Sequence, residues 1–263
     1  KGDNLKVCLI EELEAHIHPQ AQMKVISALL QEDRVQFILT THSPNITSKV
    51  KLGKDNDVNS ILMCNSNNVF PMGPGYTKLE KKDYEYLDTF LDVTKSNLFF
   101  AKGVILVEGW AEEILIPIMV KKTLGISLDE LGISLINVRS TGFENLALLF
   151  HNQRIKKRCA IITDLDRSIT GKVTKAHKLG LSRKEKLRGL KKRSKWIGSF
   201  FAEHTFEIEF IKAGNVDAIL STIKDVYVDN ATIKISEEDI KSDDIKKYGK
   251  RILTMAENKG KGW

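Results

Sequence analysis

A chain of 263 residues, 42% hydrophobic and 29% charged, is long enough for one large or two smaller domains and has the composition of an ordinary soluble protein. No apolar stretch approaches the roughly 18 residues of a membrane-spanning helix, and no signal peptide opens the chain, so we expect a cytoplasmic protein without membrane contact. Cys8, Cys64 and Cys159 are isolated, which argues against a disulfide framework and a zinc site.

The net charge of +7 is unevenly distributed along the chain. Residues 1–98 carry 11 Lys and Arg against 13 Asp and Glu, whereas residues 99–263 carry 30 against 21. Most of the excess lies in residues 172–195, where eleven basic residues face only Glu185. This segregation predicts a polyanionic partner for the second half.

The first half of the chain predicts a strand, a helix and a second strand, followed by irregular segments. The strands are expected at 5–10 and 35–40, and Pro19 can occupy the first turn of a helix that runs to about Leu30. Residues 51–75 are rich in Asn, Gly, Lys and Pro, which predicts loops and a short hairpin. A helix is expected at 78–92, and a domain boundary at 93–98.

The second half alternates predicted strands and helices. Strands are expected at 104–108, 134–138 and 159–163, with helices at 111–124 and 143–151 between them. This order predicts an α/β fold with a parallel sheet flanked by helices. The basic segment 172–195 is expected to form a helical hairpin or a mobile excursion, followed by a strand at 196–201 and then helices.

Two acids and a histidine follow the strands of the first half. Glu11 and Glu12 end the first strand, and His42 follows the second. The combination EExEAHxHP and THSP resembles the Walker B, D-loop and H-loop region of ABC-type ATPases of the RecF/SMC kind. The resemblance implies that Glu11 takes the metal position, Glu12 the catalytic base and His42 the switch histidine of an ATP site in the full-length protein.

This resemblance has two departures. The family usually has Asp at the position of Glu11, and the sequence has neither a GxxxxGK[ST] phosphate loop nor an ABC signature. We therefore expect no ATP hydrolysis by this chain alone, and interpret it as the carboxy-terminal part of a longer protein. Three simpler readings stay open: a solvated acidic turn, a metal-binding pair of His16 and His18, and a structural role for His42.

A second group of acids follows the strands of the second half. Glu108 and Glu112 occur in VEGWAE, and Asp164 and Asp166 in DLD. Open α/β sheets bind ligands at the carboxyl ends of their strands. Four acids gathered there cannot all stay ionised without a cation, and carboxylate oxygens favour Mg²⁺ or Mn²⁺.

The VEGxxE and DxD pattern resembles the Toprim domain of topoisomerases, primases and certain nucleases, from about Phe99 to the end. Together with the ABC-type piece it closely resembles the OLD family of ATP-dependent endonucleases, a group that includes the nuclease subunit of the Gabija system and retron-associated effectors. The implied division is an ABC-type ATPase part at 1–97 and a Toprim nuclease domain at 98–263, with the basic excursion at 172–195.

Further site residues are implied by this resemblance. Thr205 and Glu207 match a Ser/Thr-x-Glu element, and Lys259, with Lys261 as the alternative, matches a late lysine. Ser168 and Ile169 stand where many Toprim enzymes have a glycine, which favours an OLD nuclease over a topoisomerase or primase. Two metal ions would be held by Glu108, Glu112, Asp164, Asp166 and Glu207, and Lys259 would stabilise charge on the phosphate.

The basic segment supplies candidate DNA contacts, because several faces of one helix would carry cations that bind phosphates without sequence preference. These residues are Lys184, Lys186, Arg188, Lys191, Lys192, Arg193 and Lys195. The alternative is a solvated basic excursion without DNA contact.

The predicted function is metal-dependent cleavage of DNA. Regulation by ATP, a homodimeric or larger assembly, a role in antiphage defence and a defence-system partner protein are implied by the resemblance alone. One alternative is a non-catalytic Toprim DNA-binding scaffold of a RecF/SMC-like repair ATPase, although such scaffolds lose the metal acids. Another is a topoisomerase, which needs a nucleophilic tyrosine domain, but Tyr84 and Tyr86 lie in the predicted linker helix without a supporting motif.

Overall fold

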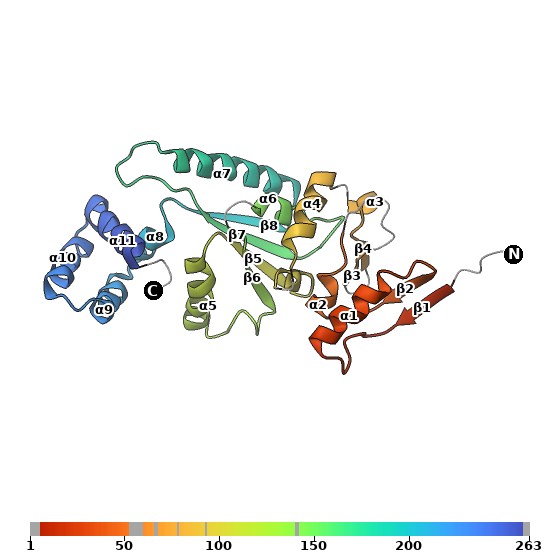
Figure 1. The fold of residues 1–263 in the computed structure, drawn as a ribbon. Coiled ribbons are helices and arrows are strands. Elements are labelled where there is room, and N and C mark those ends of the chain that lie inside the picture. Colours follow the sequence, from red (N-terminus) through yellow and green to blue (C-terminus); the bar gives the residue numbers. More distant parts are fainter. Residues whose placement is uncertain are drawn as a thin grey trace. The chain divides into compact units, whose positions relative to one another are not determined.

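The computed structural model describes residues 6–52, 60–65, 68–77, 79–92, 94–139 and 142–259, and Figure 1 labels its elements. The chain divides into two compact units. The first comprises 1–104, 132–134 and 145–158, and the second comprises 105–131, 135–144 and 159–263. The boundary expected near residue 97 from the sequence stays a prediction.

The first unit begins with the strand, helix and strand predicted from the sequence. Strands β1 (Lys6–Ile10) and β2 (Val35–Leu39) pair in parallel, with Ile10 opposite Leu39, and α1 (Pro19–Leu29) connects them. Helix α2 (Pro44–Thr47) follows β2. The apolar side chains of Val7, Leu9 and Ile38 are 49%, 74% and 50% exposed, although strands this apolar are usually buried.

The remainder of the first unit contains the predicted hairpin and helix. Strands β3 (Leu62–Asn65) and β4 (Asn68–Pro71) are antiparallel, and α3 (Pro74–Thr77) follows them. Helix α4 (Lys81–Phe90) starts later than position 78 because Glu80 and Asp83 form a capping box at its first turn. A short 3-10 helix, η1 (Lys95–Phe99), precedes the central sheet.

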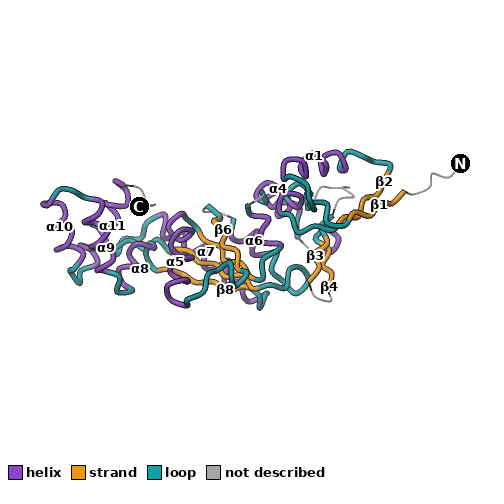
Figure 2. The backbone as a smooth tube through the Cα atoms, turned by 90° about the horizontal axis from the view of Figure 1, so that it is seen from below, coloured by secondary structure: helices purple, strands orange, loops and turns teal. Residues whose placement is uncertain are grey.

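The central sheet is parallel and has four strands, in the order β6 (Ile133–Asn137), β5 (Gly103–Val107), β7 (Arg158–Asp164) and β8 (Ile197–Ala202). The inner strands β5 and β7 are apolar runs, as expected for strands covered on both faces. Helix α5 (Trp110–Leu124) lies on one face and α7 (Lys175–Arg193) on the other (Figures 1 and 2). All four strands predicted for this region are confirmed.

Two helices of this region differ from the sequence-based expectation. The basic segment forms neither a hairpin nor a mobile excursion, but the single helix α7. The Thr174 hydroxyl caps this helix by accepting from the His177 N–H, and Leu187 and Leu190 are buried along it. Helix α6 (Phe143–Ala147) ends before His151, because turns follow in which the Leu149 N–H bonds back to Leu146.

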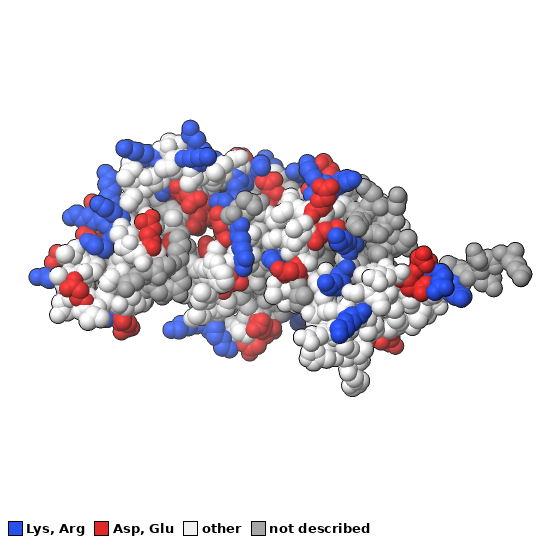
Figure 3. Space-filling model, viewed as in Figure 1, with Lys and Arg blue, Asp and Glu red and all other residues white. Residues whose placement is uncertain are grey.

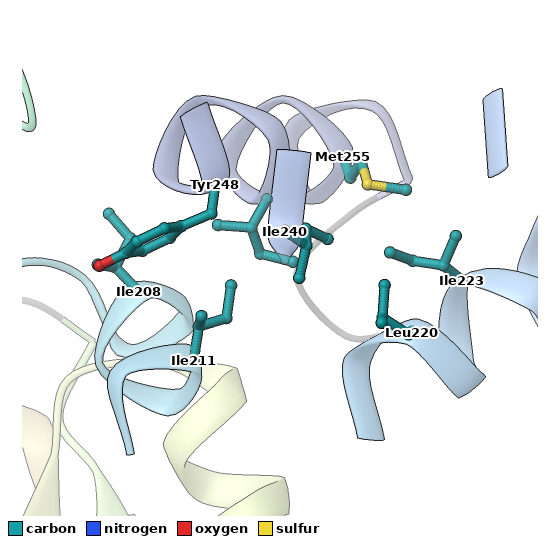
Figure 4. Packing of buried hydrophobic residues seen from close by; sticks show 8 residues of the cluster. Ile208, Ile211, Leu220, Ile223, Ile240, Tyr248 and Met255 are labelled. Carbon is teal, nitrogen blue, oxygen red and sulfur yellow. The ribbon is translucent and has the colours of Figure 1, made fainter. Parts of the chain in front are cut away.

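Four helices form the carboxy-terminal part of the second unit. They are α8 (Phe206–Lys212), α9 (Val216–Val226), α10 (Asn230–Ile240) and α11 (Ile245–Lys259), and they gather into one cluster (Figures 1 and 2). A buried apolar core joins them (Figure 4), and its members are Ile208, Ile211, Leu220, Ile223, Ile240, Tyr248, Ile252 and Met255. This core fixes α8, whose first turn carries Glu207.

Among the described residues, no helix is both long and apolar enough to span a membrane.

Candidate metal centre

The carboxyl ends of β5 and β7 bring the two acidic motifs together. These strands are neighbours in the sheet, so Glu108, directly after β5, lies beside the end of β7. The Thr163 hydroxyl donates a hydrogen bond to Glu108 Oε2 at 2.6 Å across the two strand ends. The predicted proximity of the VEGxxE and DxD motifs is therefore observed.

Helix α5 positions the second acid of the VEGxxE motif. Gly109 is the N-cap of α5, and Glu112 lies in its first turn with 5% of its surface exposed. An ideal Cβ added at Gly109 would lie 3.0 Å from Glu112 Oε2. The glycine therefore leaves room for this carboxylate, which lies at the end of the helix where the macrodipole favours negative charge.

Asp164 is the most strongly perturbed acid of the site. Burial and the charges of Glu112, Glu108, Asp166 and Glu207, in that order, raise its pKa to about 8. Ionising Asp164 is costly because it adds a negative charge to a partly desolvated cluster of four other acids. The other four predicted metal ligands are thus each close enough to Asp164 to repel its charge.

The start of α8 contacts Asp164 directly. The Phe206 N–H donates to Asp164 Oδ2 at 3.2 Å, in the first turn of the helix that also carries Glu207. Thr205, the N-cap of this helix, has a buried hydroxyl oxygen with no hydrogen-bond partner among the described residues. The Thr-x-Glu element predicted from the sequence therefore lies beside the DxD motif.

A polar network ties the DxD loop to the segment before α8. Asp166 has a left-handed backbone with φ of 52°, and the next N–H, from Arg167, donates to the Glu203 carbonyl at 3.1 Å. The Arg167 carbonyl accepts from His204 Nδ1 at 2.6 Å. These bonds hold Asp166 and Glu207 near each other.

The same network contains a compact group of possible ligand atoms. Within the described ranges, Glu203, His204 and Glu209 form a group of metal-ligand type whose atoms all lie within 4.8 Å of one another. Lys212 pairs with Glu209 at 3.1 Å and with Glu203 at 3.7 Å, and Glu209 also accepts from the His204 N–H. Because Lys212 and Arg167 together balance the charges of Glu203 and Glu209, this group has little need of a metal ion.

Arg183 is the site residue that sequence reasoning missed. Its Nη1 donates to Glu108 Oε1 at 2.9 Å, and its Nη2 donates to the Asp164 carbonyl at 2.8 Å and lies 3.9 Å from Asp166 Oδ2. Figure 3 shows basic side chains over α7 and acidic side chains beneath it. The position of Arg183 within a run of eleven basic residues concealed its separate role.

The donor set suits divalent ions that prefer oxygen ligands, because five carboxylates with little compensating charge surround the end of the sheet. In the described residues, however, no three of these five acids have ligand atoms that all lie within 4.8 Å. The side chain of Lys259, the last residue of α11, and the whole of Lys261 lie outside the described residues. The roles of these site residues stay predictions.

The predicted ATP-site residues lie at one edge of the first unit. Glu11 and Glu12 follow β1 and His42 follows β2, and all three are exposed. Glu14 joins the two segments, because it accepts from the Thr41 hydroxyl at 2.8 Å and from the His42 N–H. Burial raises the pKa of Glu14, but these hydrogen bonds outweigh it and lower the pKa below its usual value.

The structure bears on two alternatives considered for the sequence. His18 Nδ1 accepts from the Gln20 N–H and caps α1, which gives this histidine a structural function. Tyr84 is 2% exposed and its hydroxyl contacts the Met72 carbonyl at 3.1 Å, while Tyr86 stacks on Phe90. Tyr84 is therefore not an accessible nucleophile of the topoisomerase kind.

A parallel sheet with clustered acids at its strand ends is an α/β domain with a candidate metal site. Comparisons with known proteins indicate which α/β domains it is similar to. Residues 99–166 match the family model "Overcoming lysogenization defect protein-like, TOPRIM domain", and residues 1–47 match "AAA ATPase domain". The chain therefore contains an OLD-like Toprim domain after a fragment of an AAA-type ATPase domain. Glu207 and Lys259 lie beyond the matched ranges.

Individual proteins similar to this chain were also found. Endonuclease GajA of Bacillus cereus (strain HuB5-5) is 29% identical over an alignment of 189 residues that covers 62% of this chain and 27% of that protein. The carboxy-terminal region of the Burkholderia pseudomallei OLD protein is 28% identical with a TM-score of 0.47, over 62% of this chain and 84% of that one. The corresponding region of the Xanthomonas campestris pv. campestris OLD protein is 25% identical with a TM-score of 0.46, over 62% and 82%.

Proposed function

We propose that the Toprim-like region is a metal-dependent endodeoxyribonuclease. The observation that carries this proposal is the gathering of five carboxylates at the carboxyl ends of β5 and β7 and the start of α8. Burial there, together with the charges of the other four acids, raises the pKa of Asp164 to about 8. Such a cluster destabilises a protein unless cations bind to it. The similarity to endonuclease GajA also supports phosphodiester cleavage as the reaction.

Glu108, Glu112, Asp164, Asp166 and Glu207 would hold two Mg²⁺ or Mn²⁺ ions. Two such ions supply positive charge near the attacking and leaving oxygens of an in-line phosphodiester hydrolysis. The chain itself orients the ligands. The Thr163 hydroxyl holds Glu108 through Oε2, the Phe206 N–H holds Asp164, and Gly109 leaves the space that Glu112 occupies.

The exposed side of α7 carries cations that could bind the phosphates of the DNA backbone. Lys191, Lys192 and Arg193 are exposed at its last turn. Other predicted contacts are already engaged: Lys186 pairs with Glu144 at 3.2 Å and Arg188 with Glu185 at 3.1 Å. We expect the exposed cations of the last turn to contribute most to binding, because an existing surface pair must open before its cation can contact a phosphate.

An exposed aromatic residue at the start of α5 offers a further contact. Trp110 is 60% exposed, and the Arg139 guanidinium lies over its ring at 5.6 Å from the centroid. Arg139 follows β6 with φ of 50°, and its N–H donates to the Asn137 side chain at 3.0 Å. A base can stack on such an exposed ring, and the guanidinium can contact a phosphate.

The test is nicking of supercoiled plasmid with Mg²⁺ or Mn²⁺, with EDTA as the metal-free control. The chain is compared with Asp164→Asn, which removes one ligand, and with Asp225→Asn, which makes the same change at an exposed position of α9. We expect metal-dependent conversion to nicked or linear DNA by the wild type and Asp225→Asn. Asp164→Asn should lose at least about a hundredfold in rate, as expected when a group central to metal catalysis is removed.

The rival function is a non-catalytic DNA-binding scaffold. It predicts DNA binding with no metal-dependent cleavage and no difference between the two Asp variants. A longer protein with its complete ATPase domain is then needed for comparison, because the chain spans only 27% of the length of endonuclease GajA. In that longer protein we propose that ATP binding regulates cleavage, within a homodimer or larger assembly that serves antiphage defence, with a partner protein of that system.

A further inference from the structure

Helix α7 is docked on the DxD loop along one face. His177, Gly180 and Arg183 are spaced by three residues, which places them on the same side of a helix. His177 Nδ1 bonds to the Leu165 carbonyl at 2.9 Å, and an ideal Cβ at Gly180 would lie only 2.7 Å from the same carbonyl oxygen. The backbone of α7 therefore touches the loop between Asp164 and Asp166, and Arg183 is the next residue on that face.

Arg183 is held among the acids by several contacts at once. It binds Glu108 and the Asp164 carbonyl, and 18% of its side chain is exposed. Its Nε is buried and has no hydrogen-bond partner among the described residues. Burying a charge whose hydrogen bonds are incomplete is costly, so the negative charge of the surrounding acids must offset the burial of this guanidinium.

The position of Arg183 affects the geometry of the acids. Its guanidinium bonds to Glu108 Oε1, and its Nη2 lies 3.9 Å from Asp166. The other four acids each repel the charge of Asp164, yet among the described residues no three of the five acids have ligand atoms that all lie within 4.8 Å of one another. The guanidinium thus occupies the side of the cluster that faces α7, where it neutralises acids that a divalent ion would also neutralise.

We propose that Arg183 is the built-in counter-cation of the metal centre: it holds the acid cluster together in the metal-free protein and competes with divalent ions for Glu108. The proposal rests on the proposed metal-dependent function and concerns how metal loading of that site is controlled. Metal binding exchanges the Arg183–Glu108 ion pair for a metal–Glu108 bond. Because Arg183 belongs to α7, metal loading alters the attachment of the basic helix to the DxD loop.

The test measures metal-free stability and Mn²⁺ affinity, not cleavage. Arg183→Met removes the charge, Arg183→Gln removes the charge but keeps a donor for Glu108, and Arg183→Lys keeps the charge. Arg188→Met is the matched control, because it removes the same charge from the same helix at an exposed pair with Glu185. Thermal unfolding in EDTA at pH 8 and calorimetric titration with Mn²⁺ are recorded for each variant.

We expect the two readouts to move in opposite directions for Arg183→Met and Arg183→Gln. The melting temperature in EDTA should fall by several degrees, because the acids lose their counter-ion. The Kd for Mn²⁺ should decrease roughly tenfold, because a competing charge a few ångströms away has gone. Arg183→Lys should resemble the wild type in Mn²⁺ affinity, and Arg188→Met should resemble it in both readouts.

Two results would overturn the proposal, and they are distinguishable. The first is that Arg183→Gln is folded but binds Mn²⁺ with the affinity of the wild type or with a lower one. Arg183 then does not compete with the metal ion, although the chain has a metal site. If the wild type binds no Mn²⁺ at all, the metal centre itself is wrong, and the proposed function fails with it.

Discussion

Asp164 connects the electrostatics of the site to the stability of the protein. Its pKa in the folded chain is about 8, against 3.8 for an ordinary aspartate, so the folded state binds one more proton than the unfolded state between these values. Stability of the metal-free protein therefore falls as pH rises from about 4 to about 8 and then levels off. Metal binding at neutral pH should release a proton from this carboxyl.

Asp164→Asn removes this penalty because the amide is neutral at every pH. In EDTA at pH 8.5 the variant should be more stable than the wild type by about 2–4 kcal/mol, and at pH 5 the two should be nearly equal. Urea unfolding at the two pH values measures the difference. Parallel pH profiles for the two proteins would show that Asp164 ionises normally in the folded state.

At the scale of elements, α7 has two faces with different surroundings. One face is docked on the DxD loop through His177, Gly180 and Arg183, and the other presents exposed cations. Two glycines of α7 allow the close contact between α7 and the DxD loop to be tested, one as the test position and the other as the control. Gly180 lies against the Leu165 backbone, whereas Gly189 has open space around it.

Gly180→Ala should destabilise the protein by about 1–3 kcal/mol, because its methyl group meets a backbone that cannot move aside as a side chain would. Gly189→Ala should be neutral or stabilising by up to about 1 kcal/mol, since alanine favours a helix over glycine. Denaturant unfolding of both variants is the measurement. Equal effects of the two substitutions would contradict close docking at Gly180.

The exposed face of α7 predicts a salt-dependent contribution to DNA binding. Lys191→Gln with Lys192→Gln should weaken binding to any duplex sequence equally. The plot of log affinity against log salt should become shallower by about 2, because each cation that neutralises a phosphate releases nearly one counter-ion. Lys121→Gln with Lys122→Gln, in the last turn of α5, is the control of equal charge and should leave the slope unchanged. An unchanged slope for the α7 pair would mean that these lysines are solvated and do not contact DNA.

At the scale of the whole molecule, a helical cluster supports the metal centre from outside the sheet. The core shared by α8, α9, α10 and α11 holds the first turn of α8, which supplies Glu207 and the N–H that binds Asp164 (Figure 4). Gly249 brings α11 close to Ile169, in the segment after the DxD motif, with 3.0 Å from its ideal Cβ to Ile169 Cγ2. The site therefore depends on residues far from it in the sequence.

Ile223→Ala should destabilise this cluster by about 2–5 kcal/mol, because Ile223 is fully buried and its truncation leaves a cavity. Ile235→Ala, on the exposed side of α10 with 49% of its surface accessible, should cost less than about 1 kcal/mol. Urea unfolding measures both effects, and Mn²⁺ titration shows whether the metal centre weakens with the cluster. Similar costs at the two positions would mean that the cluster is not the well-packed core described above.

Much of the architecture was predictable because it depends on local patterns. Apolar runs ending in acids indicated β5 and β7 and the strand ends at which Glu108 and Asp164 meet, and Thr205 was found at the start of a helix. The length of α7 was not predictable from its charges, since buried Leu187 and Leu190 stabilise it by packing. Two helix ends differed from the prediction: α4 starts later because Glu80 takes part in a capping box, and α6 ends earlier because turns follow Ala147.

The sequence by itself determined the α/β class, the order of strands and helices, and which acids gather at the strand ends, because side-chain periodicity and residue type express these directly. Only the tertiary structure decided that Arg183 points away from the exposed cations of α7 and into the acid cluster, and that Asp164 is the carboxyl with the raised pKa. Both outcomes depend on burial and on distances between segments far apart in the chain. Coulomb energy and desolvation vary with those distances, and no local pattern encodes them.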